Sequence, residues 1–271
     1  MAVAPRGLCG VIHLPPMPGD PRYVSGGFEG VLDSATRDAE ALVAGGVDSI
    51  IVENFGSAPF AKGGPESRVP PHQVAMLSLV VRAARSLGKP VGVNCLRNDG
   101  YSALGIAAAT GASFVRINVH SGAYVTDQGL IEGEAHHTLR YRASLGAEGV
   151  AILADVMVKH AVPLAPTTAT DATHDTLLRG LADAVVVSGR ATGAPVDREL
   201  LLEVRAAAGD AVVLLGSGLT PELGDTLGPL ADGAIVGTWV KERGDVRAPV
   251  DPARVRELVA AVRGKLRAAP V

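Results

Sequence analysis

The sequence predicts a (βα)8 barrel, a closed sheet of eight parallel strands surrounded by helices. Short runs rich in Val, Ile and Leu recur along the chain, and each is followed by a polar or Gly-rich stretch and then by an amphipathic or Ala-rich segment. Eight such units fit within 271 residues, a usual length for one barrel of this kind. We therefore expect a single barrel domain over residues 1–271, with a doubly wound open sheet as the alternative.

The predicted strands are the runs of apolar and β-branched residues. They cover residues 8–14, 47–54, 90–96, 113–120, 150–158, 182–189, 211–217 and 232–238. Four of them share a weak internal repeat, in which a helix end leads through a small or acidic residue into the strand, as in "GGVDSIIVEN" and "GLADAVVVSG". Parallel strands need crossover helices and a closed sheet leaves no unpaired edge, so the repeat favours closure into a barrel.

The predicted helices lie between these strands and after the last one. They cover residues 31–45, 70–88, 100–110, 134–146, 170–180, 197–208, 220–228 and 251–267. Each has a Gly or another stop signal near its end, and the next strand follows within a few residues. The segment "GAYVTDQGLIEG", residues 122–133, is predicted to be a long loop after the fourth strand, in which Asp127 and Gln128 can close over a ligand.

The composition limits the classes of partner. The chain has 25 Lys and Arg against 28 Asp and Glu, so its net charge of −3 gives no bulk attraction for nucleic acid or an anionic membrane surface. No apolar run approaches the length of a membrane span, and the N-terminus lacks a signal-peptide pattern. Cys9 and Cys95 lie inside apolar runs, as reduced buried thiols usually do. We expect a cytoplasmic protein that binds a small molecule and can form homo-oligomers.

Polar side chains stand where the predicted strands end. In a barrel of this type the carboxyl ends of the strands and the loops after them build the active face. The stretch "GVIHLPPMPGDPRY" ends the first strand at His13, and the prolines after it stiffen the loop. Glu53 ends the second strand and Asp155 lies late in the fifth. An imidazole and carboxylates in one site can act as general acid and base, so we predict that these three residues are catalytic.

The other strand ends supply candidate substrate-binding residues. They are Asn94, Arg97, Arg116, Asn118, His120, Lys159 and Ser188. Period-two alternation predicts that Arg116, Asn118 and His120 share one face of their strand, toward the barrel interior. Lys159 has two other interpretations: a lysine that forms a Schiff base with a carbonyl substrate, or a solvated lysine beyond the strand end.

A Gly-rich segment late in the chain predicts a phosphate site. In "LLGSGLTPELGDTLGPLADGAIVGTW", Gly216 and Gly218 let backbone N–H groups approach an anion, and Ser217 adds a hydroxyl. Gly237 and Thr238 follow the last strand. Because barrels of this type commonly bind a phosphate between the loops after strands seven and eight, we predict that these five residues bind the phosphate of a small ligand. The alternative is that the glycines serve only tight turns.

Several longer stretches carry a resemblance to a known family. They are "GVIHLPPMPGDPRY", "GGVDSIIVENFGSAPF", "PVGVNCLRND", "GASFVRINVHSGAYVTDQGLIEG", "ADVMVKHA" and "LLGSGLT" with "ADGAIVGTWVK". From about residue 8 to residue 262 the chain resembles the BtpA family, which includes SgcQ-like barrel proteins. The resemblance implies a (βα)8 fold related to phosphate-binding barrels. The family name comes from a role in photosystem I accumulation in cyanobacterial thylakoids.

The spacing of the residues contains no strong metal motif. A divalent metal is an alternative that needs three or four side chains to converge, from the set His13, Glu53, Asp155, His120 and His160. FMN is a further alternative, because the same Gly-rich turns can hold its phosphate. The aromatic content of 3% offers little to stack on the flavin ring.

These features together predict an enzyme that acts on a small phosphorylated ligand, of the phosphosugar or nucleotide-like type. The acid and base groups suit lyase, isomerase or glycosyl-transfer chemistry. Two other functions stay open: a non-catalytic factor for photosystem I biogenesis or stability, and an FMN-binding barrel. An exposed apolar patch favours the former, and a yellow purified protein favours the latter.

Overall fold

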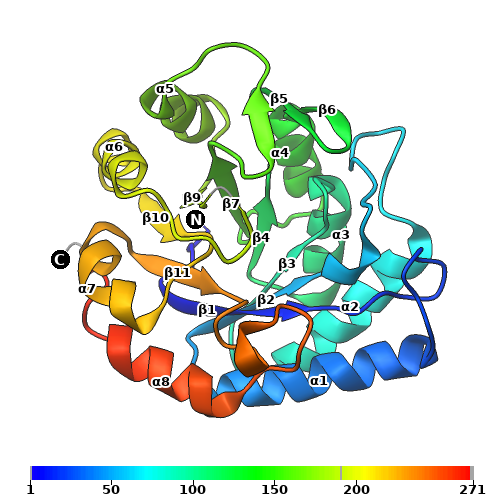
Figure 1. Ribbon diagram of the computed structural model, residues 1–271. Coiled ribbons are helices and arrows are strands. Elements are labelled where there is room, and N and C mark those ends of the chain that lie inside the picture. The colour runs from blue at the N-terminus through cyan, green and yellow to red at the C-terminus, as the bar shows by residue number, and fades with distance from the viewer. Residues whose placement is uncertain (1, 190, 269–271) are drawn as a thin grey trace.

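The computed structural model describes residues 2–189 and 191–268, and its main sheet is a closed barrel of eight strands (Figure 1). The strands are β1 (Gly7–His13), β2 (Ser49–Glu53), β3 (Val91–Asn94), β4 (Phe114–Ile117), β7 (Ala151–Val156), β9 (Ala184–Val187), β10 (Val212–Leu215) and β11 (Gly233–Val236). They pair in parallel in the order β1-β11-β10-β9-β7-β4-β3-β2. The predicted (βα)8 fold is confirmed, and each predicted strand corresponds to one barrel strand.

Helices surround the barrel on its outer side (Figure 1). They are α1 (Gly27–Gly45), α2 (Pro71–Arg85), α3 (Gly100–Thr110), α4 (Ala135–Ser144), α5 (Ala169–His174), α6 (Arg198–Ala208), α7 (Gly224–Leu227) and α8 (Pro252–Val262). Within the described ranges, none of them combines the length and the apolar character that crossing a membrane requires.

Most helices differ from their predicted extents by one to four residues at an end, and three differ more. The predicted helix over residues 220–228 is broken into α7 and two short 3-10 turns, Pro221–Leu223 and Gly228–Leu230, each of which has a proline at its start. The helix predicted over residues 170–180 consists of α5 followed by a π-helical turn, Asp175–Arg179. The last helix ends at Val262 rather than at residue 267.

Two apolar layers hold the barrel together. The inner layer fills the interior of the barrel and includes the Phe114 ring. A Cβ at residue 92 would lie 2.1 Å from this ring, so only glycine leaves enough space there. The outer layer lies between strands and helices and includes the fully buried Leu42, Leu104 and Leu258. Burial of each such side chain contributes about 1.5–3 kcal/mol. The ends of the strands are therefore fixed by packing on both faces of the sheet.

The segment predicted as a long loop contains two strands, so that prediction is wrong. β5 (Ala123–Thr126) and β6 (Gly129–Glu132) form a hairpin, and β8 (Ala161–Pro163) pairs with β5 on its other side. Tyr124 and Ile131 face inward onto a small apolar cluster. The two residues between the strands make the tight turn of a hairpin, and the strands are only four residues long, so their alternating pattern is weak in the sequence.

The amino ends of the barrel strands are held by a cluster of charges around Asp232, the residue before β11. Its Oδ1 accepts hydrogen bonds from Arg6 at 2.5 Å and from Arg267 at 3.1 Å. Its Oδ2 accepts from Arg205 at 2.9 Å. One buried carboxylate thus joins the segment before β1, the helix α6 and the segment after α8.

Candidate functional site

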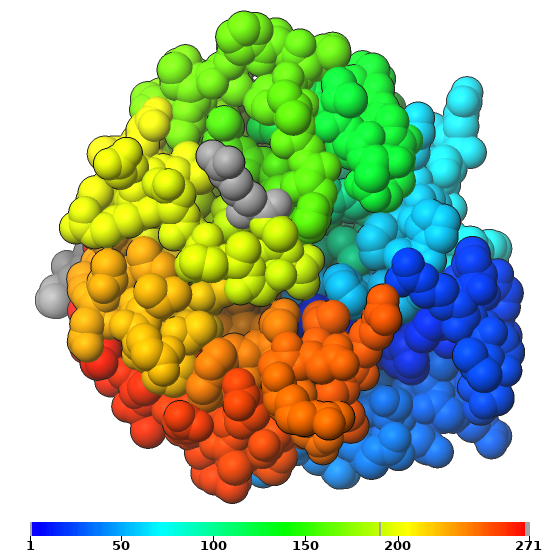
Figure 2. Space-filling view, in the orientation of Figure 1, coloured from blue at the N-terminus to red at the C-terminus, as the bar shows by residue number. Residues whose placement is uncertain are grey.

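Two adjoining cavities lie at the carboxyl ends of the barrel strands. The first has a volume of about 180 Å³ and the second of about 480 Å³. Both are bordered by Glu53, Arg116, Lys159 and Thr192, so they meet at these residues. Figure 2 shows the loops that follow the strands crowding around a narrow hollow near the middle of this face. A ligand in the two cavities would lie across the barrel axis.

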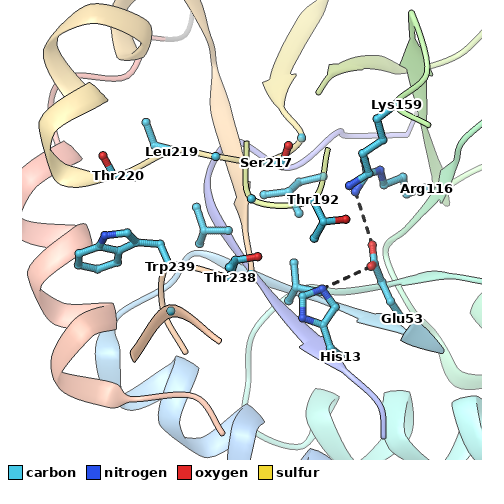
Figure 3. A pocket seen from close by; sticks show the side chains of 18 residues that line it. His13, Glu53, Arg116, Lys159, Thr192, Ser217, Leu219, Thr220, Thr238 and Trp239 are labelled. Atoms are coloured by element: carbon cyan, nitrogen blue, oxygen red, sulfur yellow. Dashed lines mark hydrogen bonds and ion pairs between the residues drawn. The ribbon is translucent and has the colours of Figure 1, made fainter. Parts of the chain in front are cut away.

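Glu53 and His13 face each other in the first cavity (Figure 3). They are register partners at the ends of β2 and β1, and Glu53 Oε2 lies 3.7 Å from His13 Nε2. The other oxygen, Oε1, accepts a hydrogen bond from Asn94 Nδ2 at 3.0 Å and lies 3.5 Å from a guanidinium nitrogen of Arg116. These contacts fix the carboxylate by one oxygen and leave Oε2 directed at His13.

The environment of His13 keeps its imidazole neutral. Burial lowers the pKa of His13 well below its usual value, and the positive charges of Lys241, Lys159 and Arg116 lower it further. The Phe55 ring packs against the imidazole with 4.6 Å between ring centroids. A neutral imidazole beside a carboxylate can donate a proton to an oxygen or accept one from it, which is the property that acid–base chemistry needs.

Asp155 holds Arg116 and borders neither cavity. Its two oxygens accept from Arg116 Nε at 2.8 Å and from a terminal nitrogen of the same guanidinium at 2.9 Å, and Oδ2 also accepts from Asn118 at 3.0 Å. Ser188 Oγ accepts from Arg116 at 3.3 Å. Both carboxylate oxygens of Asp155 are thus engaged by protein donors, and the catalytic role predicted for Asp155 stays a prediction. Asp155 and Ser188 position Arg116, and Arg116 reaches the ligand space.

His120 lies apart from the two cavities. Strand β4 ends at Ile117, so the predicted alternation does not continue to residue 120. The His120 ring is buried and its Nε2 forms a hydrogen bond of 2.8 Å with the Gly180 carbonyl. The structure therefore brings Arg116 and Asn118 to the second cavity but gives His120 a contact with the turn after α5, in place of the predicted substrate-binding position.

Lys159 and Arg97 bring two positive charges to the second cavity. Lys159 lies in a turn in which Met157 and His160 have left-handed φ values of 53° and 55°. For a residue other than glycine this conformation costs about 1 kcal/mol or more. An Arg97 terminal nitrogen donates to the Lys159 carbonyl at 2.8 Å. Burial lowers the pKa of Lys159 to about 8, and the nearby Arg116 charge adds to the effect.

The glycines of the predicted phosphate site are required for packing. A Cβ at Gly216 would lie 2.3 Å from Ser188 Oγ, and one at Gly237 would lie 2.6 Å from His13 Cε1. Gly218 has a φ of +72°, and its Cβ would lie 2.1 Å from the Ala194 carbonyl oxygen. The close approaches alone thus explain these three glycines.

The backbone of the same turns offers donors to the first cavity. Ser217, Gly218, Gly237 and Thr238 all border it. Across residues 2–189 and 191–268, no backbone carbonyl accepts a hydrogen bond from the N–H groups of these four residues. Backbone N–H groups that lack a protein acceptor can bind an anion where they point into a cavity.

The proposed metal ligands do not assemble. Glu53 and His13 meet, but Asp155 is bound to Arg116 and His120 to the Gly180 carbonyl. In the part of the chain that the structure describes, no three His, Cys, Asp or Glu side chains form a group that could hold a metal ion.

Several residues around the cavities were not among the predicted site residues. They are Arg22, Phe55, Phe60, Thr192, Trp239 and Arg247. All of them lie outside the barrel strands, and they meet only because the barrel closes, so no local spacing marks them in the sequence. The segment "SGRATG", residues 188–193, follows β9. Its Thr192 borders both cavities, and its Arg190 lies outside the described residues.

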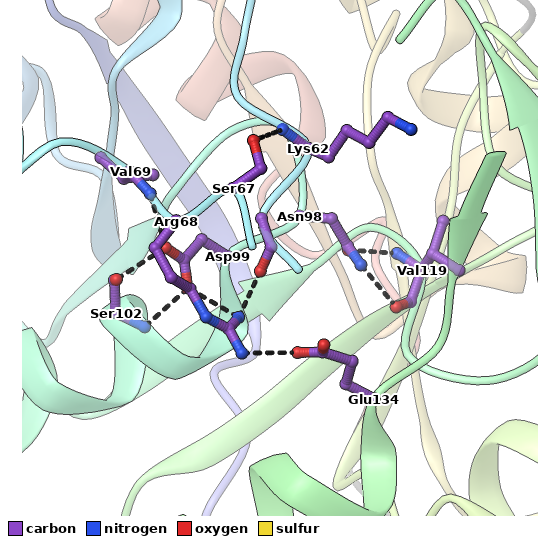
Figure 4. A network of polar contacts seen from close by, with 10 residues as sticks. Lys62, Ser67, Arg68, Val69, Asn98, Asp99, Ser102, Val119 and Glu134 are labelled. Atoms are coloured by element: carbon purple, nitrogen blue, oxygen red, sulfur yellow. Dashed lines mark hydrogen bonds and ion pairs between the residues drawn. The ribbon is translucent and has the colours of Figure 1, made fainter. Parts of the chain in front are cut away.

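A polar network supports the loops beside the second cavity (Figure 4). Asp99 accepts hydrogen bonds from the backbone of Val69 at 2.8 Å and of Ser102 at 2.9 Å, and from Arg68 at 3.1 Å. Arg68 also bridges to Glu134 at 3.0 Å. The network joins the loop after β2, the start of α3 and the start of α4.

Solved structures similar to this chain are barrels of low sequence identity. The structure of KGPDC from Streptococcus mutans in complex with D-R5P superposes with a TM-score of 0.61 at 11% identity, covering 96% of this chain and 98% of that chain. The 2-keto-3-deoxy-6-phospho-gluconate aldolase from Zymomonas mobilis superposes with a TM-score of 0.54 at 16% identity, covering 98% of this chain and 96% of that chain. At these identities the similarity extends to the fold.

Sequence relatives are much more similar. The photosystem I biogenesis protein BtpA of Synechocystis sp. is 46% identical over 96% of this chain and 89% of the relative. The protein TK2179 of Thermococcus kodakarensis is 46% identical over 93% of each chain. The family model described as "BtpA family" matches residues 5–264. Nearly the whole chain, including every element that builds the two cavities, is thereby covered, and the chain belongs to the BtpA family.

Proposed function

We propose that this protein is an enzyme that transfers protons on a small phosphorylated ligand of the phosphosugar type, in an isomerase or lyase reaction. One observation carries the proposal. Within residues 2–189 and 191–268, Glu53 Oε2 accepts no hydrogen bond, and it lies 3.7 Å from Nε2 of the neutral His13 imidazole. Both side chains border the same cavity as the turns after β10 and β11, where four residues have N–H groups without a backbone acceptor in the same ranges. A ligand phosphate at the turns would leave its carbon chain beside these two side chains.

The pair supports proton transfer next to a carbonyl group. A carboxylate can take a proton from carbon while a neutral imidazole polarises or protonates the adjacent oxygen. Arg116 contributes a fixed positive charge, held by Asp155, that stabilises negative charge developing on the ligand. Glycosyl transfer by two carboxyl groups is less well supported, because Asp155 has both oxygens engaged and does not border the cavities.

The phosphate end of the proposal is tested by placing a negative charge in the turn after β11. Thr238→Glu adds a carboxylate to the N–H groups, so we expect sorbitol 6-phosphate to lose its thermal stabilisation of the protein. Thr238→Gln has nearly the same size without the charge and is the matched control. Equal stabilisation of both variants by sorbitol 6-phosphate would contradict the phosphate site.

The proposed proton transfer is tested by hydrogen exchange at carbon in deuterated water. Phosphorylated aldoses, ketoses and sugar acids are incubated with the protein, and deuterium incorporation at carbon is followed by NMR. We expect incorporation into at least one compound, and a decrease of about 100-fold or more in Glu53→Gln. Glu40→Gln, on the exposed side of α1, is the control for charge removal. Exchange that persists in Glu53→Gln excludes Glu53 as the base.

A second candidate function is an assembly role, and one surface favours it. Val125, Leu130 and Val162 lie in register across the sheet β6-β5-β8 and are 49%, 41% and 67% exposed. Such a row suits contact with another protein or with a second copy of this chain. Size measurement by light scattering tests self-association, which Val125→Lys with Val162→Lys should abolish. The Synechocystis relative, 46% identical, is named for photosystem I biogenesis, which is compatible with this second role.

We also infer a reducing, cytoplasmic setting. Cys9 and Cys95 are both free and buried. Burial raises the pKa of Cys9 to about 12, so its thiol is poorly reactive. Localisation of the tagged protein by cell fractionation checks this inference.

A further inference from the structure

Positive charge is in excess at the second cavity, where three carboxylates, Glu53, Asp127 and Asp245, face five cationic side chains, Arg22, Arg97, Arg116, Lys159 and Arg247. Arg97 is 5% exposed, yet within residues 2–189 and 191–268 it forms no ion pair, and its terminal nitrogen donates only to the Lys159 carbonyl. Lys159 forms no ion pair in the same ranges, although it borders both cavities. Arg116, which also borders this cavity, is matched by Asp155 and Glu53.

Unpaired charges away from water are costly unless a counterion accompanies them. Burial lowers the pKa of both Arg97 and Lys159, which reflects this cost. A guanidinium and an ammonium converging on one cavity suit a carboxylate or a phosphate, and the planar guanidinium fork matches a carboxylate well.

An unpartnered acceptor lies beside these cations. Asn118 is 1% exposed and borders the second cavity, and its Nδ2 donates to Asp155 at 3.0 Å. Its Oδ1 is buried and has no hydrogen-bond partner among the residues that the structure describes. A buried amide oxygen of this kind is satisfied by a ligand hydroxyl. A hydroxyl on the ligand group next to the cations would satisfy this oxygen.

We propose that Arg97 and Lys159 bind a second anionic group, a carboxylate, and that the ligand of this protein is a phosphorylated sugar acid. This inference rests on the proposed function, because it takes the phosphate to lie in the first cavity. The carboxylate lies in the second cavity with a neighbouring hydroxyl on Asn118 Oδ1. Glu53 belongs to both cavities and thus stands beside the carbons between the two anionic ends.

The test compares two probes that differ in one anionic group. 6-Phosphogluconate has a carboxylate where sorbitol 6-phosphate has a hydroxymethyl group, and both are open chains. We expect isothermal titration of the full chain to give at least about 10-fold tighter binding of 6-phosphogluconate, the effect of a charge-assisted contact. Fructose 1,6-bisphosphate, whose second anion is a phosphate, should bind more weakly than 6-phosphogluconate.

Variants identify the residues responsible. Arg97→Met should reduce the preference for 6-phosphogluconate over sorbitol 6-phosphate to about 2-fold or less, and Lys159→Met should also reduce it. Arg179→Met, at a side chain that is 84% exposed, is the matched control and should keep the full preference. If Arg97→Met does not fold, Lys159→Met decides the outcome.

The outcomes separate this inference from the proposed function. Equal binding of the two probes by the wild type, or a preference that persists in both variants, overturns the carboxylate site and leaves the phosphate site standing. Tighter binding of the bisphosphate assigns the second anion as a phosphate and overturns the sugar-acid assignment. Binding of neither probe overturns both proposals.

Discussion

At the scale of single residues, the site depends on short distances that only particular side chains allow. His13 has space because residue 237 has no side chain, and Glu53 is oriented by Asn94 and Arg116 on one oxygen only. Asp155 acts through Arg116. Some polar residues at the strand ends, such as Asp155 and Ser188, therefore do not border the two cavities.

Gly237→Ala tests the fit around His13. The new Cβ would lie 2.6 Å from His13 Cε1, so the imidazole must move. We expect a loss of about 1–3 kcal/mol in the free energy of unfolding, the usual effect of overpacking, together with a loss of exchange activity. Gly30→Ala, within α1 and with open space around it, should instead stabilise the protein by about 0.5–1 kcal/mol. Urea unfolding measures both.

The pKa of Lys159 predicts a pH dependence of anion binding. Because the pKa is lowered to about 8, the ammonium group is charged below this pH and neutral above it. The affinity for 6-phosphogluconate should therefore decrease as the pH rises from 7 toward 9.5, on the order of the contribution of one charge. Titration calorimetry across this range checks the prediction. A flat profile, or the same profile in Lys159→Met, would contradict it.

The lowered pKa of Lys159 also predicts that the free energy of unfolding increases as the pH rises, whereas the ligand affinity decreases. In the unfolded chain Lys159 keeps its proton up to its usual value of 10.5, whereas the folded protein releases it near 8. Between these values the unfolded state binds more protons, so the folded state gains stability as the pH rises. Wild type should gain relative to Lys159→Met between pH 8 and 10 in urea unfolding.

At the scale of elements, loops are attached to helix starts by side chains that serve two purposes. Asp99 caps α3 and also holds the loop after β2 through Val69 and Arg68 (Figure 4). Asp197 caps α6 by accepting from Glu199 and Leu200, with no such second attachment among its described contacts. The two caps form a natural comparison.

Asp99→Ala should destabilise the protein more than Asp197→Ala does. Loss of a cap alone costs about 1 kcal/mol, which is the expectation for Asp197→Ala. Asp99→Ala also leaves the Val69 N–H without its acceptor and removes one of the two carboxylates that pair with Arg68, so we expect a loss of roughly 2–4 kcal/mol. Thermal or urea unfolding of both variants measures the difference. Equal losses would show that the network adds nothing beyond the cap.

The sequence predicts the elements of the barrel far better than it predicts the site. Buried strands such as Ser49–Glu53 are continuous apolar runs with a distinct signal, and their ends locate His13, Glu53 and Arg116. The hairpin of β5 and β6 is short and half exposed, so its signal is weak. His120 was misplaced because alternation along a strand does not reveal where the strand ends. Which loops approach the cavities depends on closure, which no local pattern encodes.

At the scale of the whole molecule, the candidate site and the charge cluster that joins the two ends of the barrel lie at opposite ends of the strands. The cavities lie at the carboxyl ends of the strands, and the Asp232 cluster lies at the amino ends. Disturbing the cluster should therefore change the stability of the protein without changing its ligand affinity.

Asp232→Ala tests this separation. It leaves three arginine side chains, 12–31% exposed, without their shared carboxylate, and we expect a loss of about 3 kcal/mol in the free energy of unfolding. Affinity for sorbitol 6-phosphate should stay within about 2-fold at a temperature where the variant is folded. Asp225→Ala, which removes an exposed pair with Lys265, is the control and should cost less than about 1 kcal/mol.

The Asp232 carboxylate also joins the first strand–helix unit of the barrel to the last one. Arg6 and Arg267 bind the same oxygen, so the first and last strand–helix units meet as neighbours around a ring. A chain in which Arg6 and Arg267 were joined by a short linker, and which was opened instead at the exposed Glu148 in the loop between α4 and β7, would contain the same ring of units. We therefore expect such a circular permutant to form the same barrel.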